Sequence, residues 1–467
     1  MINVIIYILI YSLLGGIFFM GRLFGTDGVR GIANESLDCD LAFKLGQAGA
    51  YVLTSQSKKP RILIGRDTRI SGDMLEAALV AGICSVGAEA ELVGVMPTPA
   101  IAYLTRHYQA DAGIVISASH NSMEYNGIKF LDKDGFKLSD EIESKIESII
   151  LDDIEQIKLP TGVDVGRTVS VKKAAKDYTE FLLSTAECRY DGLKVVLDCA
   201  NGAAYDIAPK IFAELGASVS SFYIQPDGSN INEHCGSTHP ERLMQIVKET
   251  GADVGFAFDG DADRVLAIDE HGVLVDGDKI MAVCAISMRN KNKLKNNTLV
   301  ATVMSNLGLF IALNEVGIKV EQAAVGDRYV IERMKEGGHV LGGEQSGHIV
   351  FLEHNTTGDG ILTAIQLLDV MAQTSEKLSE LTSVVKTYPQ VLVNAKVDEQ
   401  KKHTYMQDEI IKNEIERIEK MFHGEGRVLI RPSGTEPLVR VMIEAKDKAV
   451  IKKEAEQLAE LIEKRLK

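Results

Sequence analysis

The hydrophobic positions of the chain repeat one arrangement three times. Apolar runs at 62–64, 195–197 and 299–303 each lead through a polar loop into a helical stretch, which is followed by a glycine and a second apolar run. Strand, loop, helix, glycine and strand in this order predict a βαβ unit with parallel strands. Because the units recur roughly every hundred residues, we expect three related α/β domains with mixed sheets.

The C-terminal part follows a different pattern. Short strand-like runs occur at 390–397, 428–430 and 439–444, while charged amphipathic stretches at 405–421 and 448–466 favour helices. This combination predicts a smaller α+β domain after the three α/β domains. The resulting domain boundaries are 20–174, 175–273, 274–386 and 387–467, after an apolar extension at 1–19.

The extension is the one segment that this pattern does not explain. Residues 1–20 carry no charge, and the stretch is long enough to cross a bilayer as a helix. A signal peptide fits poorly, because neither a basic residue nor a small-residue cleavage motif precedes Arg22. A membrane anchor, a packed helix and sequence upstream of a native start at Met20 remain open at this point.

Overall composition excludes some classes of protein. Hydrophobic residues make up 45% and charged residues 25% of the chain, as in ordinary folded proteins. The net charge of −15 argues against a nucleic-acid partner, which needs clustered Lys and Arg. A small anionic substrate remains compatible, because a few arginines act locally over a Debye length of about 8 Å. None of the six cysteines forms a C-x-x-C pair, so neither a zinc site nor a disulfide framework is indicated.

A polar loop at 117–122 follows the apolar run 113–116. In open α/β sheets, ligands bind at the carboxyl ends of strands, so Ser119 is a candidate nucleophile. His120 beside it suggests a hydrolase, but adjacent side chains point apart and no G-x-S-x-G motif is present. A Ser/Asn-rich turn without chemistry is the alternative.

The segment 258–264 places carboxylates at Asp259, Asp261 and Asp263. Such close acidic groups repel one another unless a cation holds them, which favours a divalent metal. A calcium EF-hand is rejected, because Arg264 stands where its loop needs glycine and the flanking runs indicate strands. Hard oxygen ligands suit Mg²⁺ beside a phosphoryl group. A solvated acidic turn is the alternative.

Two further loops carry polar groups suited to a sugar phosphate. In the loop 343–348, Glu344 and Ser346 are suited to bind vicinal hydroxyls of a sugar. In the loop 431–437, an arginine, two hydroxyls and a glycine form a plausible phosphate cradle together with Arg440. Each loop, taken alone, is equally compatible with a simple turn.

Taken together, these loops resemble those of the α-D-phosphohexomutases, and within them the bacterial phosphoglucosamine mutases. The likeness runs from about residue 21 to the C-terminus and includes the opening FGTDGVRG at 24–31 and the serine loop continuing through 125–129. The family loop usually reads S-H-N-P, whereas this chain has Ser122 in place of the proline, which bears on loop rigidity. Because such proteins begin a few residues before FGTDG, we expect residues 1–19 to be extraneous.

The resemblance implies four domains around a central cleft and a mutase reaction. Ser119 carries a phosphoryl group, which binds one Mg²⁺ together with Asp259, Asp261 and Asp263. The phosphoserine donates this group to the 1-hydroxyl of glucosamine 6-phosphate. The resulting 1,6-bisphosphate turns over in the cleft and returns its 6-phosphate to Ser119. The released glucosamine 1-phosphate feeds the synthesis of UDP-N-acetylglucosamine and the cell wall.

Phosphoryl transfer depends on positioning and charge neutralisation, and this requirement predicts roles for further residues. Arg30 and Arg264 lie near the phosphoryl donor, and Lys129 is the candidate general base, with a pKa lowered by Arg30 and the metal. His120 is a second candidate base or a loop-stabilising residue. The residues expected to bind substrate are Arg264, Glu344, Ser346, His348, Arg431, Ser433, Gly434, Thr435 and Arg440.

We expect a cytoplasmic protein whose partner is a small sugar phosphate, with neither nucleic acid nor membrane, and a homodimer remains open. The alternatives are a phosphomannomutase or phosphoglucomutase of the same superfamily and a non-catalytic sugar-phosphate sensor. A hinge near residue 386 would allow the cleft to open for the intermediate.

Overall fold

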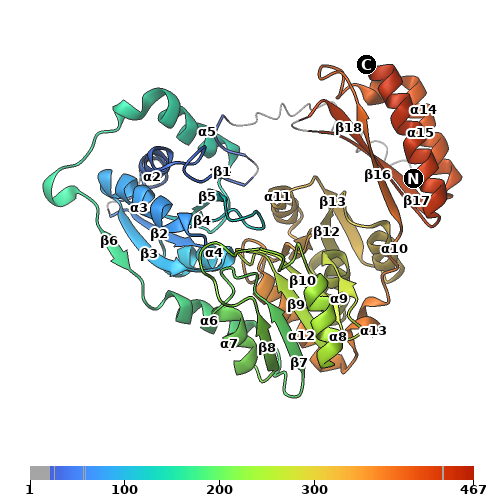
Figure 1. The fold of residues 1–467 in the computed structure, drawn as a ribbon, viewed down its shortest axis with the longest axis horizontal. Helices are drawn as coiled ribbons and strands as arrows, with labels where there is room; N and C mark the ends of the chain where they lie inside the picture. Colours follow the sequence, from blue (N-terminus) through green and yellow to red (C-terminus); the bar gives the residue numbers. More distant parts are fainter. Residues whose placement is uncertain (1–21, 26, 56, 58, 434–435) are drawn as a thin grey trace.

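The computed structural model describes residues 22–25, 27–55, 57, 59–433 and 436–467. The apolar extension at 1–19 therefore lies outside the described residues. The described chain forms four sheets of six, five, four and three strands, each with its own helices (Figure 1).

The first domain contains the six-stranded sheet, in the order β1-β5-β4-β2-β3-β6. Its centre is parallel, whereas β5 runs antiparallel to both β1 and β4. The elements are β1 (Val29–Ile32), α2 (Cys39–Leu53), β2 (Arg61–Arg66), α3 (Ser71–Ser85), β3 (Glu89–Val95), α4 (Thr98–His107), β4 (Ala112–Ile116), β5 (Tyr125–Asp132), α5 (Asp140–Ser148) and β6 (Thr168–Ser170), with short helical turns η1 (Ile149–Asp153), η2 (Ile154–Gln156) and η3 (Gly162–Asp164).

The second and third domains have smaller mixed sheets, in the orders β11-β10-β9-β7-β8 and β13-β12-β14-β15. The second contains α6 (Ala174–Thr185), β7 (Lys194–Asp198), α7 (Ile207–Glu214), β8 (Ser218–Phe222), α8 (Glu241–Thr250), β9 (Val254–Phe258), β10 (Val265–Asp269) and β11 (Leu274–Val275). The third contains α9 (Gly277–Asn290), η4 (Lys295–Asn297), β12 (Thr298–Thr302), α10 (Leu307–Glu315), β13 (Lys319–Ala323), α11 (Asp327–Gly337), β14 (Leu341–Gly343), β15 (Ile349–Phe351), α12 (Gly360–Thr374) and α13 (Leu378–Thr382).

The fourth domain is an antiparallel sheet in the order β16-β18-β17, with two long helices packed against it (Figure 1). Its elements are β16 (Gln390–Lys396), η5 (Tyr405–Gln407), α14 (Glu409–Met421), β17 (Gly426–Pro432), β18 (Leu438–Ala445) and α15 (Lys448–Leu466). The helix expected at 405–421 starts four residues late, because Asp408 caps α14 through its carboxylate and leaves a 3₁₀ turn before it.

The three predicted βαβ units are confirmed, since β2 and β3, β7 and β8, and β12 and β13 each pair in parallel. Their glycines have a backbone reason: Gly87, Gly216 and Gly317 have φ values of +89°, +99° and +73°. Each follows the end of its helix in a positive-φ conformation, which is less favourable in free energy for residues with a side chain. The mixed-sheet α/β fold with an α+β domain is likewise confirmed.

The buried hydrophobic clusters connect some domains and not others. One buried cluster contains Ile101 of the first domain, Leu197 of the second and Leu299 of the third, whereas the fourth domain has a cluster of its own. The first three domains therefore share apolar packing, and the fourth is stabilised separately. Within the described ranges, no helix is long and apolar enough to cross a membrane.

Candidate active site

Ser119 lies in a tight loop immediately after β4. Its φ of +52° is uncommon for a residue with a side chain and indicates a constrained turn. The side chain is buried, and its Oγ donates a hydrogen bond of 2.6 Å to Asp259 Oδ2. The backbone N–H donates to Ser117 Oγ at 2.9 Å. The candidate nucleophile of the first domain thus touches the acidic loop of the second.

Arg69 binds the backbone of this loop. Its guanidinium is fully buried and donates to the carbonyl oxygens of Ser119, at 3.0 Å, Asn121, at 2.8 Å, and Ser122. Ser122 stands where the family has proline, and its hydroxyl binds the Glu124 carboxylate. The loop is therefore ordered by hydrogen bonds to its carbonyls even without the proline ring.

Two more side chains complete the support of the loop. Asp67 Oδ2 lies 2.9 Å from Arg69 Nε and accepts a hydrogen bond of 2.6 Å from Ser117 Oγ. Asn232 Nδ2 of the second domain donates to the Ser119 carbonyl at 2.9 Å. Sequence reasoning missed these residues, because nothing in the chain reveals that β2 and β4 are neighbours and bring their loops together.

The three aspartates occupy the turn between antiparallel strands β9 and β10, which confirms the strand flanks and the rejection of an EF-hand. All three are buried, and one oxygen of each lies within 4.8 Å of the others. The Oδ1 atoms of Asp261 and Asp263 have no hydrogen-bond partner. Burial, together with the other two carboxylates, raises the pKa of Asp259 well above its usual value. This donor set fits a divalent cation.

Gly260 lets the two loops touch. A Cβ at this position would lie 2.5 Å from the Ser119 carbonyl oxygen, which is closer than side-chain carbons approach. Any larger residue would push the acidic turn away from the serine. The glycine of the DGD sequence is thus explained by the approach of two backbones.

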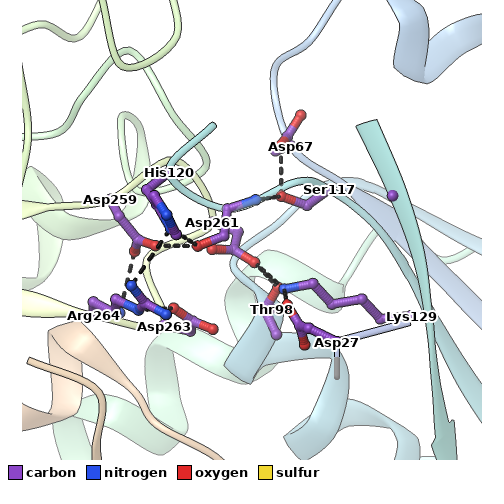
Figure 2. A network of polar contacts seen from close by, with 12 residues as sticks. Asp27, Asp67, Thr98, Ser117, His120, Lys129, Asp259, Asp261, Asp263 and Arg264 are labelled. Carbon is purple, nitrogen blue, oxygen red and sulfur yellow. Dashed lines mark hydrogen bonds and ion pairs between the residues drawn. The ribbon is translucent and has the colours of Figure 1, made fainter. Parts of the chain in front are cut away.

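Lys129 points from β5 toward the acidic turn, between Asp261 at 2.9 Å and Asp27 at 3.0 Å (Figure 2). Burial disfavours its charge, but attraction to these carboxylates outweighs burial and raises the pKa of Lys129. Arg30 lowers the pKa of Lys129, as expected, but the nearby carboxylates outweigh it. The expected net lowering is therefore not seen, because Asp27 lies beside the ammonium, and the part of it assigned to the metal stays a prediction. Thr98, at the start of α4, fixes Asp261 by donating its hydroxyl to Oδ2 at 2.7 Å.

His120 lies beside the serine hydroxyl, with Arg264 next to the imidazole. His120 Nδ1 lies 3.3 Å from Ser119 Oγ and 3.4 Å from Arg264 Nη1. Burial, Arg264 and Arg30 lower the pKa of His120. Arg30 pairs with Asp27, and the Nε atoms of Arg30 and Arg264 are buried without a hydrogen-bond partner. The Arg264 guanidinium therefore has an unused donor in the neighbourhood of His120.

The loop of the third domain reaches the same turn through His348. This side chain is buried, its Nδ1 lies 3.5 Å from Asp263 Oδ2, and its Nε2 accepts a hydrogen bond of 3.0 Å from the Gly358 N–H. Glu344 Oε1 accepts from the Gly326 N–H at 3.0 Å, and Ser346 is exposed. Their contacts with substrate stay predictions.

The predicted phosphate cradle lies in the fourth domain. Arg431 and Arg440 face each other across β17 and β18, and burial together with Arg440 lowers the pKa of Arg431. Ser433 is buried and accepts the Glu436 N–H at 3.2 Å. Gly434 and Thr435 lie outside the described residues. In Figure 1 the third domain lies between this sheet and the serine-bearing domain.

Models of the four domains of phosphoglucomutase/phosphomannomutase match the chain. The α/β/α domains I, II and III match residues 21–156, 176–272 and 276–388, and the C-terminal domain matches 392–461. The chain belongs to this family. The resemblance inferred from the loops is thereby confirmed.

Curated relatives narrow the position within the family. A phosphoglucosamine mutase of Acetivibrio thermocellus is 61% identical over 96% of this chain and 100% of its own length. One of Clostridium acetobutylicum is 58% identical, again over 96% and 100%. The chain therefore belongs to the phosphoglucosamine mutase branch, as the resemblance of its loops indicated.

Solved structures share the fold at low identity. A Burkholderia thailandensis phosphoglucomutase/phosphomannomutase family protein has a TM-score of 0.79 at 24% identity and covers 95% of this chain and 98% of its own. Aspergillus fumigatus N-acetylphosphoglucosamine mutase, solved with GlcNAc-6P and magnesium, has a TM-score of 0.67 at 16% identity, with 96% of each chain covered.

Proposed function

We propose that this phosphohexomutase interconverts glucosamine 6-phosphate and glucosamine 1-phosphate through a phosphorylated Ser119. The observation that carries the proposal is the contact of Ser119 Oγ with Asp259, at 2.6 Å, inside a cluster of three buried aspartates. Full-length identity to phosphoglucosamine mutases supports the choice of sugar.

In the forward half-reaction, the bond between Ser119 Oγ and phosphorus breaks while one forms to the sugar 1-hydroxyl oxygen. The proton of that hydroxyl passes to a base, and Ser119 Oγ takes up a proton as it leaves. The 1,6-bisphosphate then reverses in the site. In the second half-reaction, the bond between the 6-oxygen and phosphorus breaks, Ser119 is rephosphorylated and glucosamine 1-phosphate leaves. Positioning and charge neutralisation are the main requirements of such transfers.

Asp259, Asp261 and Asp263 would hold Mg²⁺ together with an oxygen of the phosphoserine. When bound, Mg²⁺ supplies positive charge that offsets the transferring phosphoryl group. The unpartnered Oδ1 atoms of Asp261 and Asp263 support this assignment, as does the magnesium in the Aspergillus relative. The Arg264 guanidinium lies next to His120 and is suited to the same charge.

The sugar hydroxyl needs a proton acceptor. Lys129, the first candidate, ends at the acidic turn, within 2.9 Å of Asp261. Its carboxylate neighbours favour the ammonium form, which accepts a proton only after losing its own. His120, 3.3 Å from Ser119 Oγ and with a lowered pKa, is the second candidate.

The distal phosphate would bind Arg431 and Arg440, whose facing charges it would offset.

The test is conversion of several sugar phosphates by the purified chain. Glucosamine, glucose and mannose 6-phosphates are each supplied, and the 1-phosphates are measured. We expect the glucosamine substrate to have the highest kcat/KM. Faster turnover of glucose or mannose phosphate would assign the activity of another member of the superfamily. No turnover of any of the three would favour a sugar-phosphate sensor.

Removal of the metal gives an independent test. After dialysis against excess EDTA we expect activity to be lost and Mg²⁺ to restore it, because the buried carboxylates need a cation to bind the phosphoserine. Full activity in excess EDTA would contradict the assignment of the aspartates.

A further inference from the structure

A lysine outside the four motif loops joins the first and third domains beside the active site. Lys137 lies in the turn after β5, and Asp327 is the first residue of α11. The Lys137 ammonium lies 2.5 Å from Asp327 Oδ2 and also donates to Asp27 Oδ1. One side chain therefore binds carboxylates of two domains.

From each of these carboxylates a chain of contacts reaches the acidic turn. Asp27 Oδ2 lies 3.0 Å from Lys129 Nζ, which lies 2.9 Å from Asp261 Oδ2. Figure 2 shows this arm, with Lys129 between the two carboxylates.

The other arm runs through the third domain. Asp327 Oδ2 lies 3.7 Å from His348 Nε2, and His348 Nδ1 lies 3.5 Å from Asp263 Oδ2. Because Asp261 and Asp263 belong to the same turn, the two arms close a ring of polar groups. Within it, His348 Nε2 accepts the Gly358 N–H, so the imidazole packs between Asp327 and Asp263 and faces Asp327 with a lone pair. Lys137 is the member farthest from the aspartates that bind the metal.

The ring is shielded from solvent. The exposed fractions of the Lys137, Asp27 and Asp327 side chains are 16%, 20% and 14%, and that of His348 is 2%. Although burial disfavours its charge, Asp27 and Asp327 raise the pKa of Lys137, so the ammonium persists at neutral pH. Screening by salt is weak at such depth.

The two carboxylates depend on Lys137 to different degrees. Asp27 also pairs with Lys129 and Arg30. Among the ion pairs of the described residues, Asp327 has Lys137 as its one lysine or arginine partner, with His348 beside it. Loss of the ammonium would leave the Asp327 carboxylate facing the lone pair of His348 Nε2. Repulsion between them would displace the imidazole from its place beside Asp263.

The turn itself is attached to the third domain by other contacts. Phe136 packs against the buried cluster of that domain, with the Lys335 ammonium 4.1 Å from its ring centroid. Thr356 Oγ1 donates to the Gly135 carbonyl at 2.7 Å. Removing the charge of Lys137 should therefore change the ring without separating the domains.

We propose that Lys137 is a positioning residue for phosphoryl transfer, because it fixes Asp27 and Asp327 and thereby the turn that carries the three aspartates. The proposal rests on the proposed mutase function. Groups that orient metal ligands typically affect affinity or activity 10- to 100-fold, and small displacements of reacting groups have effects of similar size.

The test compares Lys137→Met, Lys137→Arg and the control Lys133→Met. Lys133 lies in the same turn, but its side chain is 71% exposed and pairs with the exposed Asp134. For Lys137→Met we expect kcat to fall about 10- to 100-fold with KM nearly unchanged. Lys137→Arg should recover most of the loss, and Lys133→Met should match the wild type.

A second readout does not need turnover. The rise of the melting temperature on addition of Mg²⁺ reports how well the aspartates bind the cation. We expect a smaller rise for Lys137→Met than for the wild type, each measured from its own melting temperature in EDTA, which the loss of a buried ammonium lowers.

A wild-type kcat in Lys137→Met would overturn the proposal. A raised KM with unchanged kcat would also overturn it, because it would indicate direct contact with substrate. So would a melting temperature in EDTA low enough to explain the lost activity. No recovery in Lys137→Arg would also count against it. If the wild type converts no sugar phosphate, the proposed function fails, while the melting comparison still decides whether Lys137 positions the aspartates.

Discussion

At the scale of single residues, Ser119 depends on side chains that its own motif does not contain. Its left-handed backbone is maintained by Ser117 at its N–H and by Arg69 and Asn232 at its carbonyl. The hydroxyl is thereby held on Asp259. The position of the candidate nucleophile therefore depends on the residues that support the loop as well as on the serine itself.

Replacement of Ser119 by alanine should lower turnover at least about a thousandfold, because no other hydroxyl lies in its position. Melting curves should remain near those of the wild type. The matched control is Ser122→Ala, since the carbonyl of Ser122, which Arg69 binds, is retained. Phosphopeptide mapping of active enzyme should find phosphate on Ser119; phosphate on Ser117 or Ser122 would contradict the assignment.

Replacement of Arg69 by methionine should destabilise the protein by about 3–5 kcal/mol, because it leaves Asp67 buried without its charge partner. Activity should also fall, as the carbonyls of the loop lose their donor. Urea unfolding measures the first effect. Arg167→Met is the control, since Arg167 is 79% exposed; equal stability of the two variants would show that the Arg69 contacts contribute little.

At the scale of elements, the start of α10 joins the third domain to the fourth. Asn306 caps this helix, and its side-chain amide binds the Tyr388 carbonyl at 2.9 Å and Glu444 at 3.1 Å. Its backbone N–H donates to Asp278 Oδ2 at 2.6 Å. Helix capping and domain attachment thus use the same residue.

Burial and nearby Asp276 raise the pKa of Asp278 from 3.8 to about 7. Between these values the folded state holds a proton that the unfolded state has lost, so the free energy of unfolding should fall as pH rises across this window. Asp278→Asn should make the fall shallower, as measured by urea unfolding at several pH values. Asp206→Asn, at an exposed site, is the control; an unchanged slope in Asp278→Asn would contradict the prediction.

At the scale of the whole molecule, the residues proposed for phosphoryl transfer and those proposed to bind the distal phosphate lie in domains with separate hydrophobic cores. The serine, the aspartates and His348 come from three domains that share a core, whereas Arg431 and Arg440 belong to a domain with its own core. Relative movement of the fourth domain, with a hinge near residue 386, stays a prediction that this division supports.

Arg431→Ala and Arg440→Ala should each raise KM by about 10- to 150-fold, because a charge-assisted contact with phosphate contributes roughly 1.5–3 kcal/mol. Phosphorylation of Ser119 should be retained, since the two arginines belong to another domain. Steady-state kinetics in both directions provide the measurement, with Lys420→Ala at an exposed lysine of α14 as control. An unchanged KM in both variants would refute the cradle.

The sequence by itself determined the elements and the chemical groups. Hydrophobic periodicity located the βαβ units, because each strand and helix must bury its own apolar face. The Asp259–Asp261–Asp263 spacing indicated a cation, because like charges so close in the chain stay close in any fold. The loop motifs identified the family for the same reason: their residues are neighbours in the chain.

Only the tertiary structure decided which distant groups meet. Arg69 reaches Ser119 because β2 and β4 are adjacent in the sheet, and Asp27 reaches Lys129 because β1 pairs with β5. Lys137 meets Asp327 because a turn of one domain packs on a helix of another. These contacts set the environment of the site, including the raised pKa of Lys129, and no local pattern encodes them, since electrostatic effects depend on distance in space rather than along the chain.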